Sequence, residues 1–255
     1  MHKNNFISSK ESVKLLSILI LALLFLIVPS AENVNSVIWW CLVLLLLGNI
    51  RKLNNRNKIS YFCRMSLYFL PYSFPIIMEG KILLNLGNRT YIAIGLAFLC
   101  FFVWLFVNYR SIQLMLSKHV IIEAYKESGY QIFLRIYNFI GAAISEELYF
   151  RQYILSLKNP LFINCLISII YFILAHWLLP WSRKYSKRDY FNQGLIGTVN
   201  VFLFIWSKSV IPCIILHLLV NSPNIIRLIK IYDRYYLRPT RYDLPNINEL
   251  SELEL

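Results

Sequence analysis

Residues 137–155 read YNFIGAAISEELYFRQYIL, an apolar stretch that carries two adjacent acids and one base in its second half. The charged residues are Glu146, Glu147 and Arg151. A charged group at bilayer depth costs at least ~2.5–3.5 kcal/mol on insertion scales, so it needs a partner or a water-filled cavity. We therefore expect a membrane-spanning helix whose charges serve a buried site, and two later apolar segments each offer a histidine to that site.

The composition is that of a membrane protein. Of the 255 residues, 58% are hydrophobic and 15% are charged, and the mean hydropathy is +0.54. Soluble domains are about 45–50% apolar and about 25% charged. We therefore predict an all-α membrane protein, a bundle of about eight transmembrane helices.

The net charge of +13 does not indicate nucleic-acid binding. The Lys and Arg residues fall in short clusters between apolar runs, as expected of loops that meet anionic lipid. No basic stripe with interleaved aromatic residues is present, so we expect no nucleic-acid partner. The five cysteines occur singly in apolar runs without metal-ligand spacing, and we interpret them as small buried hydrophobic residues.

Eight apolar segments define the predicted spans. Their approximate bounds are 15–28, 37–50, 59–78, 91–109, 136–155, 161–179, 191–206 and 210–229. The first resembles a signal peptide, but seven further spans favour an uncleaved helix. Pro71 and Pro75 predict a kink in the third span, and the mixed stretch 110–131 predicts an amphipathic helix on the inner membrane surface.

The loops show a strong positive-inside bias. With the N-terminus inside, twenty Lys and Arg residues fall on the inner side and four on the outer side. We predict a multi-pass cell-membrane protein, bacterial from its Lys-, Asn- and Ile-rich usage, with both termini cytoplasmic. Its regions are 1–134, four spans plus the inner-surface amphipathic helix; 135–230, a core of four spans; and 231–255, a polar cytoplasmic tail.

The acid pair suggests a division of roles. Glu147 and Arg151 are four residues apart, so they share a helix face and can form an ion pair. Glu146, rotated by about 100° on the helix, is then free to face another element as a general base. The alternative is a structural one, in which the ion pair locks helices together within the membrane.

Two histidines accompany the acids on later spans. Phe172 lies one turn before His176 and can pack beneath its ring. His217 is followed one turn later by Asn221, so one helix face presents an imidazole and an amide that suit hydrogen-bond donation to an oxyanion. The alternatives are an interfacial histidine at 176 and a polar clasp between helices at 217 and 221.

Three short motifs follow one another on three separate spans: Glu-Glu-x-x-x-Arg, Phe-x-x-x-His and His-x-x-x-Asn. This combination resembles the CAAX protease and bacteriocin-processing (CPBP, or Abi) family of type II CAAX prenyl endopeptidases, described as intramembrane glutamic proteases. The resemblance covers about residues 135–230. It implies that Glu146 and His176 position and deprotonate a water, that His217 and Asn221 form an oxyanion hole, and that the ion pair orients Glu146. It implies no cofactor and no metal.

Several functions remain open from the residues alone. We expect an intramembrane endopeptidase that hydrolyses a peptide or membrane-protein precursor, in bacteriocin or pheromone processing or in self-immunity. The alternative is a non-catalytic membrane scaffold or bacteriocin-immunity protein of the same fold, and a transporter is a weaker third hypothesis. Two histidines and a glutamate are also competent zinc ligands, although no HExxH motif is present.

The depth of the two histidines conflicts with a shared site. From the predicted span ends, His176 lies ~6 Å and His217 ~20 Å from the inner boundary at 1.5 Å per residue. Helix tilt, displaced helix ends or protrusion beyond the bilayer would be needed to bring them together.

Overall fold

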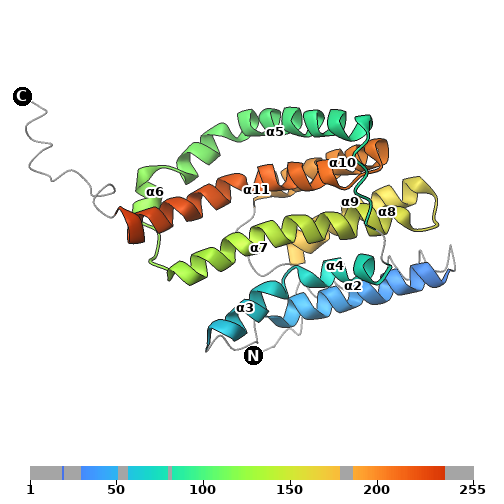
Figure 1. Cartoon of the computed structure of the whole chain (residues 1–255), viewed down its shortest axis with the longest axis horizontal. Helices are drawn as coiled ribbons and strands as arrows, with labels where there is room; N and C mark the ends of the chain where they lie inside the picture. The colour runs from blue at the N-terminus through green and yellow to red at the C-terminus, as the bar shows by residue number, and fades with distance from the viewer. Residues whose placement is uncertain (1–18, 20–29, 51–56, 80–81, 179–185, 239–255) are drawn as a thin grey trace, which may run out of the picture.

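The computed structural model describes residue 19 and residues 30–50, 57–79, 82–178 and 186–238. Every regular element in these ranges is a helix, so the predicted all-α class is confirmed. In Figure 1, α5 follows one edge of the bundle, α10 and α11 lie next to it, α7 crosses the middle, and α4 and α2 form the opposite edge. The elements are α2 (Ala31–Asn49), α3 (Lys58–Ser66), α4 (Leu70–Glu79), α5 (Asn88–Met115), α6 (Lys118–Ile122), α7 (Gly129–Glu147), the π-helical turn η2 (Leu148–Tyr153), α8 (Ile154–Ser156), α9 (Leu161–Leu178), α10 (Lys187–Ser207), α11 (Ile211–Tyr232) and the π-helical turn η4 (Asp233–Leu237).

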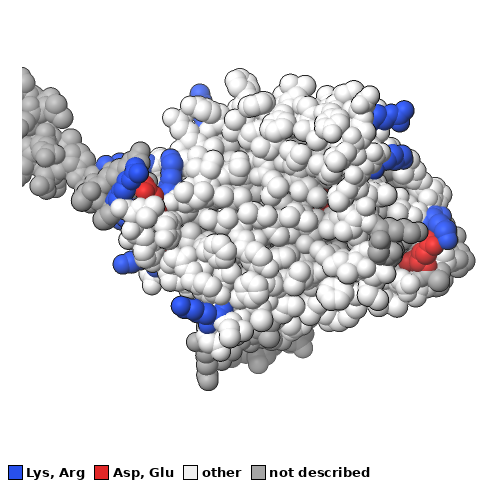
Figure 2. Space-filling view, in the orientation of Figure 1, with Lys and Arg blue, Asp and Glu red and all other residues white. Residues whose placement is uncertain are grey.

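Two helical segments are long and apolar enough to cross a membrane, judged by length and composition: α5, and α11 together with η4. The 28 residues of α5 extend about 42 Å at 1.5 Å per residue, more than the ~30 Å of a hydrocarbon core. Shorter apolar runs lie in α2 (Glu32–Leu47) and α9 (Leu161–His176). Figure 2 shows a broad uncharged surface with Lys and Arg gathered towards its two ends.

The number of spans stays a prediction. The first predicted span, residues 15–28, lies outside the described residues except for Leu19, which is helical and exposed. The cytoplasmic placement of both termini likewise remains a prediction, because the N-terminal residues and residues 239–255 are outside the described ranges.

The predicted kink in the third span is present as a break between α3 and α4. Residues 67–69 form the break, and Pro71 follows in the first turn of α4. Proline is tolerated there because the first N–H groups of a helix have no partner within the helix. Pro75 lies inside α4.

Residues 110–131 are not the single amphipathic helix that the sequence predicts. α5 continues to Met115, and the five-residue α6 follows before α7 begins at Gly129. Ser117 and Ser128 each accept a hydrogen bond from a backbone N–H at a helix start, and these N-caps divide the segment into separate helices.

The C-terminal end of α11 extends beyond the predicted start of the polar tail at residue 231. The chain stays helical to Leu237 through η4. Arg234 donates a hydrogen bond to the carbonyl oxygen of Ile121 at 2.8 Å, and the Tyr235 hydroxyl donates to a carbonyl just after α6 at 2.6 Å. These contacts fix a segment whose polar composition alone indicates a solvated tail.

An aromatic core surrounds the turn that follows the acid pair. It joins Trp40 of α2, Tyr72 of α4, Tyr149 and Phe150 of η2, and Tyr171 of α9, none of them more than 2% exposed. The rings of Trp40 and Tyr171 lie 4.6 Å apart, and those of Tyr72 and Tyr149 lie 5.5 Å apart. Burial of large rings dominates core energetics, so this cluster holds three helices, α2, α4 and α9, around η2.

α7 approaches the α3–α4 segment closely at a glycine. A Cβ atom on Gly141 would lie 2.5 Å from Cζ of Phe69, so no larger side chain fits without moving the ring. One turn further along α7, Ser145 accepts a buried hydrogen bond of 2.7 Å from the Ser73 hydroxyl of α4. The residue before Glu146 is therefore fixed to α4.

Candidate active site

The C-terminal end of α7 places both acids in the protein interior. Glu146 is 6% exposed and Glu147 is fully buried. The helix then widens into the π-helical turn η2, every residue of which is buried. Such turns are rare and occur frequently at functional sites. This one carries Arg151, the only base in the stretch.

Glu147 and Arg151 form the ion pair that their four-residue spacing predicts. Arg151 Nε lies 3.1 Å from Glu147 Oε2, and both side chains are fully buried. Arg151 Nη1 donates a hydrogen bond of 2.6 Å to the Ser168 hydroxyl, which in turn donates to the Phe150 carbonyl oxygen at 2.6 Å. The guanidinium carbon also lies 5.0 Å from the centre of the Phe172 ring. These contacts offset the desolvation that two buried charges incur.

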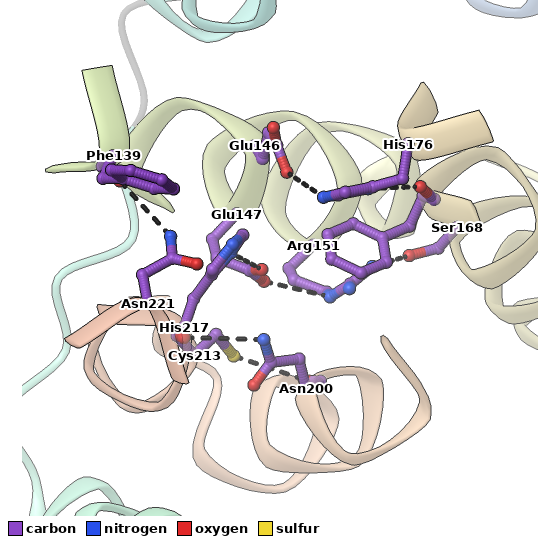
Figure 3. Close-up of polar contacts among 11 residues, drawn as sticks. Phe139, Glu146, Glu147, Arg151, Ser168, His176, Asn200, Cys213, His217 and Asn221 are labelled. Carbon is purple, nitrogen blue, oxygen red and sulfur yellow. Dashed lines mark hydrogen bonds and ion pairs between the residues drawn. The ribbon is translucent and has the colours of Figure 1, made fainter. Parts of the chain in front are cut away.

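The Glu147 carboxylate has a second partner, His217 of α11. His217 Nδ1 lies 2.9 Å from Glu147 Oε1 (Figure 3). Because an ionised carboxylate only accepts hydrogen bonds, Nδ1 carries the proton. Glu147 thus connects Arg151 with His217, whereas the family resemblance implies that the ion pair orients Glu146.

Glu146 faces the other histidine. Its Oε2 lies 3.7 Å from Nε2 of His176, and this oxygen has no hydrogen-bond partner within the described part of the chain. His176 Nδ1 lies 2.9 Å from the Phe172 carbonyl oxygen one turn earlier in α9, and a carbonyl can only accept. Nδ1 is therefore the donor, and in a neutral ring the lone pair of Nε2 points towards Glu146.

The Phe172 ring packs against both histidines. Its centre lies 4.6 Å from the His176 ring and 5.8 Å from the His217 ring. The two histidines therefore reach one site, despite the difference in depth that the predicted span ends give. The chain stays helical for twenty residues beyond His217, through α11 and η4. The predicted end of the last span at residue 229 is therefore not the end of the helix, and the depth of His217 cannot be counted from it.

Asn221 lies on the His217 side of the acid pair, one helical turn further along α11 (Figure 3). Its Nδ2 donates a long hydrogen bond of 3.4 Å to the Phe139 carbonyl oxygen of α7. An amide nitrogen has two N–H groups, so one donor remains for another acceptor. The four residues that the resemblance implies for catalysis, and the three that support them, are thus in one region.

Other polar residues of this region are not part of the three motifs. Asn200 of α10 is fully buried, its Nδ2 donates to the Cys213 carbonyl oxygen at 3.5 Å, and Cys213 Sγ donates to the Asn200 carbonyl oxygen at 3.2 Å. The Asn200 side chain also interacts with Glu147. A polar side chain within an apolar span is the signal that identifies Asn200, and Ser168 in α9, from the sequence.

The arrangement fits acid–base chemistry by side chains. Among the residues that the structure describes, no group of three or more His, Cys, Asp or Glu side chains lies close enough to hold a metal ion. Glu146 and His176 present two basic atoms side by side, while Glu147 is engaged by Arg151 and His217.

Comparison with known families agrees with the motif analysis. Residues 128–223 match the family described as type II CAAX prenyl endopeptidase Rce1-like. This range contains the acid pair, both histidines and Asn221. The searches of curated proteins and of solved structures found no match.

Proposed function

We propose that the protein is an intramembrane endopeptidase, because residues 128–223 match the Rce1-like family of type II CAAX prenyl endopeptidases, a membrane-embedded protease family. The observation that carries the proposal is the contact of Glu146 Oε2 with His176 Nε2, 3.7 Å apart and almost excluded from solvent. Two proton-accepting atoms at this spacing can both accept hydrogen bonds from one water molecule. The substrate is a membrane-associated peptide or protein precursor.

Glu146 and His176 activate the water. The water donates hydrogen bonds to the Glu146 carboxylate and to His176 Nε2, and one of these groups takes its proton as the oxygen adds to the carbonyl carbon of the scissile peptide bond. The hydrogen bond from His176 Nδ1 to the Phe172 carbonyl oxygen supports this role, because it keeps Nε2 available as an acceptor. The same proton then passes to the leaving amine as the carbon–nitrogen bond breaks.

His217 and Asn221 stabilise the negative oxygen of the tetrahedral intermediate. Asn221 offers its second amide N–H, and His217 offers Nε2–H when its ring is doubly protonated. The Glu147 carboxylate at Nδ1 balances the charge of that ring, while Arg151 and Ser168 hold Glu147 in place. Phe172 packs against both histidine rings and so helps to hold them in place.

The membrane setting follows from the predicted topology. We place the protein as a multi-pass protein of a bacterial cell membrane, with eight spans and cytoplasmic termini. The supporting observations are the two long apolar helical segments and the Lys and Arg residues at both ends of an uncharged surface. Processing of a bacteriocin or pheromone precursor, or self-immunity, accommodates a substrate that is itself bound to the membrane.

The test is peptide cleavage by purified protein in detergent or in vesicles. The probes are a quenched fluorescent peptide that ends in a farnesylated CAAX sequence and an unprenylated apolar peptide of the same length. We expect cleavage by the wild type and loss of at least ~100-fold in kcat for Glu146→Gln and for His176→Ala. Undiminished cleavage by both variants would overturn the mechanism.

Two further arms test the alternatives. A chelator that abolishes cleavage, with recovery on addition of zinc, would favour a metal-dependent reaction. A cellular immunity phenotype that Glu146→Gln and His176→Ala both retain would favour the non-catalytic scaffold.

A further inference from the structure

Tyr72 of α4 has a buried hydroxyl for which the described part of the chain offers no hydrogen-bond partner. The residue is 2% exposed. A phenol hydroxyl that is removed from water normally finds a partner, either a protein group or an ordered water, because leaving it unsatisfied is destabilising. Tyr72 lies outside residues 128–223, so neither the family match nor the three motifs assign it a role.

The surroundings of Tyr72 place it at the Glu146 side of the site. Its ring packs against Tyr149 and Phe150, with centres 5.5 and 5.6 Å away, in the turn directly after the acid pair. The next residue, Ser73, is bonded to Ser145. The Tyr72 hydroxyl also interacts electrostatically with the Glu146 carboxylate, although the two groups form no direct hydrogen bond.

The Glu146 side of the site therefore holds a donor and an acceptor that both lack hydrogen-bond partners in the described part of the chain. The donor is the Tyr72 hydroxyl, and the acceptor is Glu146 Oε2, which also lies beside His176. A single water that accepts from the tyrosine and donates to the carboxylate satisfies both groups. The hydrogen bond from Tyr72 would also hold the oxygen of this water beside Glu146, the group that takes its proton.

We propose that the Tyr72 hydroxyl is a hydrogen-bond donor of the active site, which holds the oxygen of the water that Glu146 and His176 activate. This inference rests on the proposed endopeptidase function. It makes α4, and hence the N-terminal half of the chain, a part of the reaction centre in addition to its packing role. A water fixed from a third side reacts faster because its lone pair is directed at the substrate carbonyl carbon.

The chain provides a matched control in Tyr149. Its side chain is also fully buried and its hydroxyl also lacks a hydrogen-bond partner in the described ranges. The electrostatic neighbours of that hydroxyl are Tyr153, Tyr171 and Cys41 together with Tyr72 itself, and Glu146 is not among them. Tyr72→Phe and Tyr149→Phe therefore remove the same atom from equally buried rings, and only the first should affect the water.

The first measurement needs no substrate. Melting temperatures of the wild type, Tyr72→Phe, Glu146→Gln and the double variant form a double-mutant cycle, with a parallel cycle for Tyr149→Phe. We expect a non-additivity of at least about 2 °C between Tyr72 and Glu146, because both bind the same water, and none between Tyr149 and Glu146. Additive shifts in the first cycle would overturn the inference.

The second measurement is cleavage of the farnesylated CAAX peptide. We expect Tyr72→Phe to lower kcat roughly 10- to 100-fold with little change in KM, and Tyr149→Phe to leave both unchanged. If Tyr72→Phe equals the wild type while Glu146→Gln is inactive, the inference fails and the proposed function stands. If Glu146→Gln is fully active, the proposed function fails, and the stability cycle still decides whether the two side chains share a water.

Discussion

Replacement of Arg151 by methionine tests the buried network most directly. The substitution removes a fully buried guanidinium and leaves the Glu147 carboxylate, also fully buried, with His217 and Asn200 as its remaining partners. The removal of one member of a buried ion pair typically costs about 3–5 kcal/mol, because the other charge stays in a medium of low polarity. The hydrogen bond from Arg151 to Ser168 is lost as well.

The expected result for Arg151→Met is a large fall in melting temperature. For a chain of this size, 1 kcal/mol corresponds to about 2–4 °C, so the fall should be roughly 6–20 °C. The assay is thermal unfolding of the purified protein in detergent, followed by intrinsic fluorescence. The control is Lys158→Met, which breaks an exposed ion pair with Glu32 and should leave the melting temperature nearly unchanged.

A second variant separates charge from packing. Glu147→Gln combined with Arg151→Met removes both charges, so the double variant should be more stable than the sum of the two single effects predicts, by about 0.5–3 kcal/mol. The reasoning is refuted if Arg151→Met melts like the Lys158 control, or if the two single effects add.

Three further substitutions test the packing around the site. Gly141→Ala places a Cβ 2.5 Å from the Phe69 ring and should lower the free energy of unfolding by about 1–3 kcal/mol, so an unchanged unfolding midpoint would contradict this close packing. Gly197→Ala places a Cβ 3.2 Å from Cδ1 of Phe172. Because that ring packs against both histidines, we expect a clear fall in kcat for the peptide probe with little change in melting temperature, and a lower melting temperature with unchanged kcat would contradict the argument. Ser73→Ala removes a buried hydroxyl bond to α7 and should cost about 1–3 kcal/mol in chemical denaturation, while a neutral effect would show that this bond does not fix α4.

The features that the sequence predicts correctly are those encoded within one helix. The four-residue spacing of Glu147 and Arg151 predicts their ion pair, because residues at this spacing are neighbours on a helix surface. The two prolines at 71 and 75 predict a kink in the third span, because proline lacks the backbone N–H that continues a helix. The structure has a break just before Pro71, whereas Pro75 lies inside α4. The ordered motifs likewise predict the family whose description matches residues 128–223, since each motif falls within one apolar segment.

The features that the sequence leaves undetermined depend on contacts between helices. The sequence does not reveal that Glu147 meets His217, because that contact follows from the packing of α11 against α7. The pairing of Glu146 with His176 is implied by the family resemblance alone, and not by the spacing of the residues. The π-helical turn η2 and the approach of Tyr72 also depend on the aromatic core. Predicted span ends gave the two histidines incompatible depths because composition alone does not reveal where a helix ends.

The structure gives a physical reason for two adjacent acids on one helix. Neighbouring side chains on a helix diverge by about 100°, so one pair of residues can address two other helices at once. Glu147 accepts contacts from Arg151 and His217, and its charge is thereby compensated. Glu146 lies 3.7 Å from His176, and its Oε2 is without a hydrogen-bond partner among the described residues, so that oxygen keeps its capacity to accept a proton. The same stretch of helix therefore combines a carboxylate whose role is to stabilise a charge with one that can react, and this difference makes Glu146 the stronger candidate for the general base.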